Sequence, residues 1–218
     1  MSEQFINWAK KQLGDIDTIT KEAHGDQSEV FRLQTTKGNF FLKISKNLEK
    51  ECERLKWLRG RLPVPEVIGF IKLGDKDALL LSAVEGVNLS VLSKEWPAEK
   101  IVAKLAQVLQ KFHSTEIKNC PFEVFDENKV LVHGDACLPN FIFKDDNFSG
   151  YIDLGDMGID NPEVDLAAAV WSLQYNLGSG YGLNFLRRYG IKNATEELVD
   201  KLRLQYEDMQ REWGLMEK

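Results

Sequence analysis

Two short segments decide the fold class: residues 132–140, with the sequence VHGDACLPN, and residues 151–155, with the sequence YIDLG. Together they form the pattern His-x-Asp-x4-Asn, then Asp-x-Gly after a short predicted hairpin, with Asp135, Asn140 and Asp153 as its central members. A single Asp or Asn beside a turn is usually a turn or capping residue. Three polar residues in this order, separated by two apolar strand-like segments, instead indicate a site for phosphoryl transfer.

Phosphoryl transfer from ATP depends on positioning and charge neutralisation more than on covalent help from the protein. The spacing gives Asp135 the role of the base that orients and deprotonates the attacking hydroxyl. Asn140 and Asp153 provide hard oxygen ligands for Mg2+ and stand at the ends of adjoining predicted strands. Protein kinases have a catalytic loop and a metal motif in this order with similar spacing. The ring of His133 is expected to pack and hydrogen-bond within the loop.

A cation for the nucleotide phosphates is expected at Lys43. Residues 39–44 (NFFLKI) predict a strand in which alternation places Phe41 and Lys43 on one face and the remaining apolar side chains on the other. A helix predicted over residues 47–61 has an apolar stripe, on which Glu51 is the only carboxylate. Because a carboxylate on an apolar stripe needs a partner, we predict a Lys43–Glu51 ion pair; the alternative is that Glu51 reaches solvent at the edge of the stripe. The apolar stripe consists of Leu48, Cys52, Leu55 and Leu58.

Residues 23–28 (AHGDQS) form a predicted loop just before a strand that starts near Glu29. A loop in this position is able to cover nucleotide phosphates with its backbone N–H groups. Gln27 and Ser28 are candidate contributors, although each also suits a plain turn.

The hydrophobic pattern predicts an α+β protein with a mainly β first part and a mainly helical second part. The predicted strands cover residues 30–33, 39–44, 67–73, 78–83, 129–133, 141–143 and 150–153, with a turn at 144–149. The predicted helices cover residues 3–13 and 47–61, a segment starting at Trp96-Pro97, and residues 162–176 and 195–213, the last with a stripe of Leu198, Leu202, Met209 and Trp213. We therefore expect two lobes, residues 1–82 and 83–218, joined by a hinge at about 82–86.

Composition excludes several classes of protein. Of 218 residues, 43% are hydrophobic and 28% are charged, which is ordinary globular usage. No apolar stretch reaches the roughly 20 residues of a membrane span, and the start MSEQ lacks the basic and apolar regions of a secretory signal. Three cysteines without metal-ligand spacing suit a reduced, cytoplasmic protein. The net charge of −6 argues against nucleic-acid binding, and its distribution, +2 over residues 1–82 and −8 over 83–218, favours a cationic partner for the second lobe.

Several segments resemble the aminoglycoside 3'-phosphotransferases. They are VHGDACLPNFIF (132–143), GYIDLGDMGI (150–159), DLA (165–167), VFRL (30–33), FLK (41–43), residues 51–58, residues 79–86 and HSTEIKNCPF (113–122). The resemblance implies a two-lobed, protein-kinase-like fold and the use of ATP or GTP with Mg2+.

The same resemblance implies a role for individual residues. Asp135 is the catalytic base, and Asn140 and Asp153 bind magnesium. Lys43 contacts the nucleotide phosphates and Glu51 orients it, Phe41 stacks near the adenine, Ser82 and Val84 belong to the hinge, and Asp165 is the buried acid that braces the catalytic loop.

One departure from the family bears on the acceptor. Relatives carry a helical, acidic substrate-binding insert of a few dozen residues where this chain has only residues 123–130. The acidic side chains that remain for a cationic sugar are Glu123, Asp126 and Glu127, with Glu207 and Asp208 near the end of the last helix. The expected function is phosphorylation of an aminoglycoside hydroxyl. The alternatives are kinases of another small hydroxyl compound, such as a macrolide, choline or a sugar, and a catalytically silent nucleotide-binding module.

Overall fold

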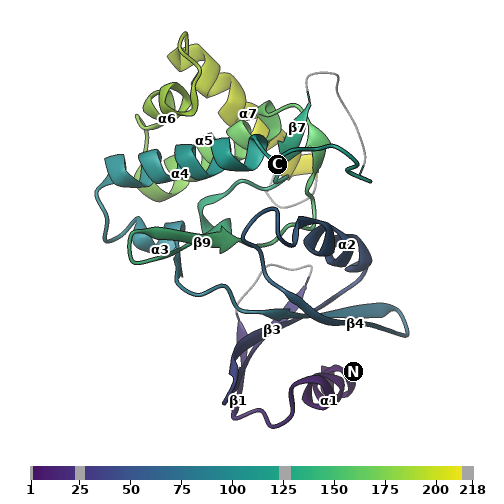
Figure 1. Ribbon diagram of the computed structural model, residues 1–218. Helices are drawn as coiled ribbons and strands as arrows, with labels where there is room; N and C mark the ends of the chain where they lie inside the picture. Colours follow the sequence, from purple (N-terminus) through teal and green to yellow (C-terminus); the bar gives the residue numbers. More distant parts are fainter. Residues whose placement is uncertain (1, 23–27, 123–128, 213–218) are drawn as a thin grey trace. The chain divides into compact units, whose positions relative to one another are not determined.

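The structure is a computed structural model that describes residues 2–22, 28–122 and 129–212. The chain divides into two compact units, Met1–Val84 and Glu85–Lys218 (Figure 1). This division falls within the hinge region expected at about residues 82–86. Each unit is described by itself below.

The first unit is built on one five-stranded antiparallel sheet with strand order β1-β2-β3-β5-β4. Its strands are β1 (Thr18–Glu22), β2 (Glu29–Thr35), β3 (Gly38–Ser45), β4 (Val67–Leu73) and β5 (Lys76–Ser82). Strands β2 and β3, both predicted, form a hairpin in which they pair from Glu29↔Ile44 to Thr35↔Gly38. The Thr35 hydroxyl accepts a hydrogen bond from the Lys37 N–H at 3.0 Å, which closes the turn.

Helices α1 (Ser2–Leu13) and α2 (Glu49–Leu58) cover opposite faces of this sheet (Figure 1). Phe5 and Ala9 of α1 belong to the same buried core as Leu42 and Ile44 of β3. Lys43 lies between these two core residues in sequence, so strand alternation turns it to the other face of the sheet. The alternation predicted for β3 is therefore confirmed.

Helix α2 is shorter than the segment predicted over 47–61. It begins after Leu48, whose backbone N–H donates to the Asp77 carboxylate at 3.0 Å. It ends at Leu58 because Arg59 leaves the helical conformation at ψ 123° and Gly60 adopts φ +78°. The predicted stripe is confirmed, with Leu48, Glu51, Cys52, Leu55 and Leu58 all buried.

The second unit contains helices, a three-stranded sheet ordered β6-β8-β9, and a two-stranded sheet of β7 and β10. Its strands are β6 (Val87–Asn88), β7 (Val130–Val132), β8 (Phe141–Lys144), β9 (Asn147–Tyr151) and β10 (Gly158–Asp160). Its helices are α3 (Leu89–Leu92), α4 (Ala98–His113), the 3-10 turn η1 (Leu138–Asn140), α5 (Glu163–Leu177), α6 (Gly182–Tyr189) and α7 (Glu196–Glu212).

The structure contains short elements that were not predicted, namely strands β6 and β10 and helices α3 and α6. Helix α6 is short and lies between Gly178–Gly180 and Gly190, which read as loop signals. Strand β9 starts at Asn147, inside the predicted 144–149 turn. The hairpin needs only a two-residue turn, because Lys144 pairs with Asn147 and Asp145 adopts φ +54°.

The buried stripe predicted for the last helix is confirmed at Leu202 and wrong at Leu198 and Met209. Helix α7 buries Val199, Leu202 and Tyr206, whereas Leu198 and Met209 are only half-buried. Trp213 lies outside the described residues. Helix α7 packs against α5, and its buried face contains Val199, three residues before Leu202, and Tyr206, four residues after it.

Candidate active site

The two predicted motif segments flank one small sheet. Strand β7 leads into the loop that carries Asp135, and strand β10 follows the loop that carries Asp153. The strands pair antiparallel with Val132 opposite Gly158, so the two loops leave the sheet at the same end. Gly134 adopts φ +87°, and a Cβ on it would lie 2.3 Å from the Asp156 carbonyl oxygen. Only glycine allows the two loops to approach this closely.

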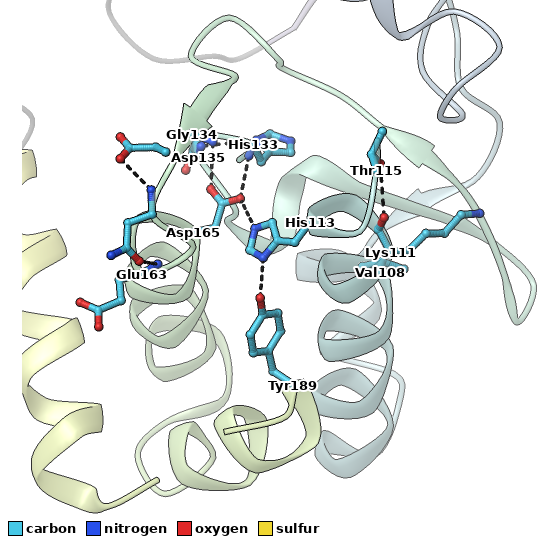
Figure 2. Close-up of polar contacts among 12 residues, drawn as sticks. Val108, Lys111, His113, Thr115, His133, Gly134, Asp135, Glu163, Asp165 and Tyr189 are labelled. Carbon is cyan, nitrogen blue, oxygen red and sulfur yellow. Dashed lines mark hydrogen bonds and ion pairs between the residues drawn. The ribbon is translucent and has the colours of Figure 1, made fainter. Parts of the chain in front are cut away.

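The carboxylate of Asp165, at the start of α5, holds the Asp135 loop from below (Figure 2). It is completely buried and accepts the backbone N–H groups of His133 at 2.6 Å and Gly134 at 2.9 Å. These two amides immediately precede Asp135. The structure thus supplies the geometry expected of an acid that braces the catalytic loop.

His113, the last residue of α4, extends this network (Figure 2). Its Nε2 lies 2.8 Å from the Asp165 carboxylate, and its Nδ1 lies 2.7 Å from the hydroxyl of Tyr189 in α6. Burial, together with the charge of Asp165, raises the pKa of Tyr189, so this phenol remains a hydrogen-bond donor at neutral pH. Helices α4, α5 and α6 are therefore joined through one buried polar chain that ends at the loop.

The His133 ring is structural, as predicted. It is fully buried between Phe112 and Phe141, with ring centroids 5.6 Å and 5.7 Å away. Its Nε2 lies 3.1 Å from the Ile152 carbonyl, and its Nδ1 accepts the Asp135 N–H at 3.4 Å. The ring thereby ties the Asp135 loop to the segment just before Asp153.

The Asp135 carboxylate is half-buried and held on both oxygens. Asn140 Nδ2 donates to Asp135 Oδ2 at 2.9 Å and to the Asp135 carbonyl at 2.8 Å. The hydroxyl of Tyr206 donates to Asp135 Oδ1 at 3.0 Å. The carboxylate is thus held in one orientation while remaining partly open to solvent.

Asn140 and Asp153 stand next to each other on adjoining chain segments. The Ile152 N–H donates to the Asn140 carbonyl at 3.0 Å, immediately after the Phe141–Tyr151 pair of β8 and β9. Asp153 is exposed and adopts φ +57°, a left-handed conformation that non-glycine residues rarely take outside functional or turn positions. The predicted placement of both residues at the ends of adjoining strands is confirmed.

Tyr206 was not predicted as a site residue. It lies 71 positions along the chain from Asp135 and is only 3% exposed. One feature of the sequence could have indicated Tyr206. A tyrosine four residues after a buried leucine brings a hydroxyl into the interior, and that hydroxyl needs a hydrogen-bond partner.

The predicted Lys43–Glu51 ion pair is present in the first unit. Lys43 Nζ lies 2.8 Å from the Glu51 carboxylate, and the side chains are 18% and 5% exposed. Strand β3 and helix α2 therefore present a cation that is oriented by a buried carboxylate. Because a pair with so little exposure is weakly screened by water and salt, its geometry is more tightly held than that of a surface pair.

The other predicted nucleotide residues of the first unit have ordinary surroundings. Phe41, Ser28, Ser82 and Val84 are half-buried. The Ser82 hydroxyl accepts the Glu66 N–H at 2.8 Å, which ties the end of β5 to the segment before β4. Gln27, and the acidic residues Glu123, Asp126 and Glu127, lie outside the described residues.

Glu207 and Asp208 of α7 both form ion pairs along their own helix. Glu207 lies 2.6 Å from Arg203 and 3.7 Å from Arg211, and its side chain is only 17% exposed. Asp208 is 69% exposed and also contacts Arg211. Asp208 is thus the more accessible of the two carboxylates.

The described ranges 2–22, 28–122 and 129–212 hold no helix with the length and apolarity to cross a membrane. They also hold no cluster of three or more His, Cys, Asp or Glu side chains able to bind a metal ion. A cation site built on Asn140 and Asp153 would need further oxygen ligands from elsewhere.

A β unit with a strand lysine paired to a helix glutamate, and a helical unit with the Asp135 and Asp153 loops, define a kinase-like phosphotransferase. The chain belongs to the phosphotransferase enzyme family (APH), whose model matches residues 19–128 and 124–202. The two matches meet at residues 124–128, where the family's helical insert was expected to be missing.

Curated relatives include the aminoglycoside 3'-phosphotransferases of Niallia circulans and Enterococcus faecalis. They are 27% and 26% identical to this chain, and each alignment covers 91% of this chain and 96% of the relative. The alignment with the Niallia circulans protein runs over 252 positions, more than the 218 residues of this chain, so gaps fall on this chain. This difference in length agrees with a missing insert.

Solved structures show the same fold. An aminoglycoside 3'-phosphotransferase of type VIII aligns with a TM-score of 0.72 at 21% identity, covering 93% of this chain and 97% of that one. An aminoglycoside phosphotransferase of Streptomyces rimosus, in complex with ADP and streptomycin, aligns with a TM-score of 0.72 at 21% identity, covering 92% and 97%. The α+β, protein-kinase-like fold is therefore confirmed.

Proposed function

We propose that this protein transfers the γ-phosphoryl group of ATP to a hydroxyl of an aminoglycoside. The observation that carries the proposal is the Asp135 carboxylate, held by Asn140 and Tyr206 on a loop braced by Asp165. A base fixed in one orientation and still partly open to solvent is what general-base activation of an alcohol requires. The curated relatives named aminoglycoside 3'-phosphotransferases support the choice of acceptor.

In this proposal Asp135 orients the acceptor hydroxyl and takes its proton as the phosphoryl group is transferred. Lys43, oriented by Glu51, contacts the nucleotide phosphates. Ser28 and Gln27 cover the phosphates, and Phe41 stacks near the adenine ring. Ser82 and Val84 belong to the hinge. ATP is the proposed donor, with GTP as the alternative nucleotide.

Asn140 and Asp153 are the proposed magnesium ligands. Asn140 turns its Nδ2 toward Asp135, so its Oδ1 is the amide atom left for a cation. The exposed Asp153 carboxylate beside it is a second hard oxygen donor, and this donor set fits Mg2+. When bound, Mg2+ would neutralise charge on the phosphates.

Two observations bear on the acceptor. The −8 balance of residues 83–218 attracts a cationic sugar. The missing insert, which removes part of an acidic wall, favours the alternative of another small hydroxyl compound, such as a macrolide, choline or a sugar. A catalytically silent module is disfavoured because Lys43, Asp135, Asn140 and Asp153 are all present.

A coupled nucleotide-consumption assay against a panel of aminoglycosides, macrolides, choline and sugars tests the proposal. We expect ATP turnover to rise above the background hydrolysis only with aminoglycosides, with the phosphorylated antibiotic detected by mass spectrometry. Turnover raised only by a macrolide, choline or a sugar would show that the acceptor is one of the alternative compounds. If no compound raised turnover, the enzyme proposal would be wrong.

The acidic end of α7 is expected to contribute uniform binding of a cationic acceptor. Replacing Glu207 with Gln and Asp208 with Asn together should raise the acceptor KM by about two- to tenfold and leave kcat unchanged, since exposed ion pairs contribute only about 0.2–1 kcal/mol each. The KM of the unmodified protein should also rise with ionic strength. Both quantities are measured by steady-state kinetics at several salt concentrations.

A matched control removes two carboxylates from elsewhere in the same unit. Glu99 and Asp146 are exposed and ion-paired like Asp208, so the variant Glu99→Gln/Asp146→Asn has the same change in net charge. It should leave the acceptor KM unchanged. A salt-independent KM that neither double variant altered would place the acceptor away from α7.

A further inference from the structure

We infer that Tyr206 is a positioning residue for Asp135: its hydroxyl holds the carboxylate in the orientation needed to receive the acceptor's proton. The inference rests on the proposed role of Asp135 as the base. It adds to the site a residue of α7 that lies outside the sequence motif and acts through Asp135.

The first support is the direction of the hydrogen bonds. Tyr206 Oη lies 3.0 Å from Asp135 Oδ1 and 3.3 Å from Cys137 Sγ. Burial raises the pKa of Tyr206 well above its usual range, and burial together with the nearby Asp135 charge raises that of the Cys137 thiol. Both groups therefore keep their protons, and the tyrosine has a single proton to donate. The carboxylate is the stronger acceptor, so the Tyr206 hydroxyl donates to Asp135. The Cys137 thiol lies beside this hydroxyl and also contacts the Ala168 carbonyl at 3.8 Å.

The second support is that packing fixes the position of the tyrosine. Tyr206 is 3% exposed and follows the fully buried Leu202 by one helical turn. Its ring lies 5.4 Å from that of Trp171 in α5, at an interplanar angle of 47°. The hydroxyl therefore reaches Asp135 from a rigid helix pair rather than from a mobile loop.

The third support is that the two oxygens of Asp135 are held from different elements. Oδ2 accepts Asn140 Nδ2 from η1, and Oδ1 accepts Tyr206 from α7. Two anchors on opposite oxygens prevent rotation of the carboxylate about its Cβ–Cγ bond. Each oxygen retains a second lone pair, so the acceptor hydroxyl is able to approach without displacing either anchor. Removing one anchor allows the base to rotate away from its productive geometry.

The test is the variant Tyr206→Phe, which keeps the ring and removes only the hydroxyl. We expect kcat to fall by about 10- to 100-fold, the equivalent of one hydrogen bond to a charged group. KM for Mg-ATP and for the acceptor should stay unchanged, because the lost contact acts on the base and not on either ligand. Tyr175→Phe is the matched control: Tyr175 also contacts the Trp171 ring, on which it stacks, but it is 76% exposed, and this variant should keep the kcat of the unmodified protein.

A kinetic double-mutant cycle separates positioning from structural support. In the Asp135→Ala background, adding Tyr206→Phe should cause no further loss of kcat, because the hydroxyl no longer has a carboxylate to hold. A tyrosine that only stabilises the fold would lower activity by the same factor in both backgrounds. If the kcat losses of the two substitutions multiplied in the double variant, the inference would be wrong. It would also be wrong if Tyr206→Phe were as active as the unmodified protein.

Failure of the inference is distinguishable from failure of the proposed function. If the unmodified protein phosphorylates an acceptor and Tyr206→Phe does so equally well, only the positioning role is wrong. If the unmodified protein phosphorylates no acceptor in the panel, the proposed function is wrong and the positioning role falls with it. The same cycle measured on the free energy of unfolding shows in either case whether Tyr206 and Asp135 interact.

Discussion

Replacing Asp135 with alanine is expected to lower kcat by about 10²–10⁴-fold, the range for loss of a positioned general base. The affinity for Mg-ATP should remain nearly unchanged, because Asp135 is proposed to contact the acceptor hydroxyl rather than the nucleotide. Steady-state kinetics measures the first quantity and calorimetry with Mg-ATP the second. If the variant kept near-normal turnover, Asp135 would be a turn residue and not the catalytic base, and the mechanism would need another base.

The variant Asp135→Asn controls for the structural part of this loss. Its amide oxygen is able to accept the Tyr206 hydrogen bond at Oδ1, so the loop keeps one of its two anchors. It lacks a basic oxygen for the acceptor proton. We therefore expect Asp135→Asn to be nearly as inactive as Asp135→Ala. It should unfold at a higher denaturant concentration than Asp135→Ala does.

The second large effect is expected on stability. Asp165→Ala should lower the free energy of unfolding by about 3–5 kcal/mol, the usual cost of removing one member of a buried charged network. The backbone N–H groups of His133 and Gly134, and the ring of His113, would all lose their acceptor in a fully buried position. Urea denaturation followed by circular dichroism measures this change.

Two comparisons make this prediction specific. Asp165→Asn keeps the volume but turns an N–H2 group toward donors, so it should also be destabilised, though less than alanine. Asp160→Asn changes a half-exposed carboxylate five positions earlier, which accepts the N–H of its neighbour Asn161. This control should unfold close to the unmodified protein. Equal stability of all three variants would show that the Asp165 network does not brace the loop.

The residues of the candidate site were predictable wherever the signal was local. The motif of Asp135, Asn140 and Asp153 predicted residues that lie close together, because one hairpin, β8–β9, connects Asn140 to Asp153 and brings both to its base. The Lys43–Glu51 pair was also predictable, since strand alternation and a carboxylate on an apolar stripe each need only a few consecutive residues. These inferences did not depend on knowing which elements pack together.

The errors at α7 and α6 have a different cause, which is that both depend on tertiary packing. The stripe of α7 was assigned to Leu198, Leu202, Met209 and Trp213, but the helix has apolar side chains on more than one face. Packing against α5 selects the face with Val199, Leu202 and Tyr206. Helix α6 was missed because its eight residues lie between glycines, and such a short helix is stable only when Phe185 and Leu186 are buried by neighbours.

The class of fold, the order of the motifs and the residues proposed for chemistry all follow from local patterns in the sequence. Hydrophobic periodicity and motif spacing are properties of adjacent residues, so they can be read without the fold. The resemblance implied that Asp165 braces the loop, but the hydrogen bonds that hold the site span long separations: Asp165 reaches the loop from 31 and 32 positions away, and Tyr206, which was not predicted, reaches Asp135 from 71. Hydrogen bonds between residues so far apart in sequence depend on how helices α5 and α7 pack. That packing comes from the sum of many weak apolar contacts, which no local pattern encodes.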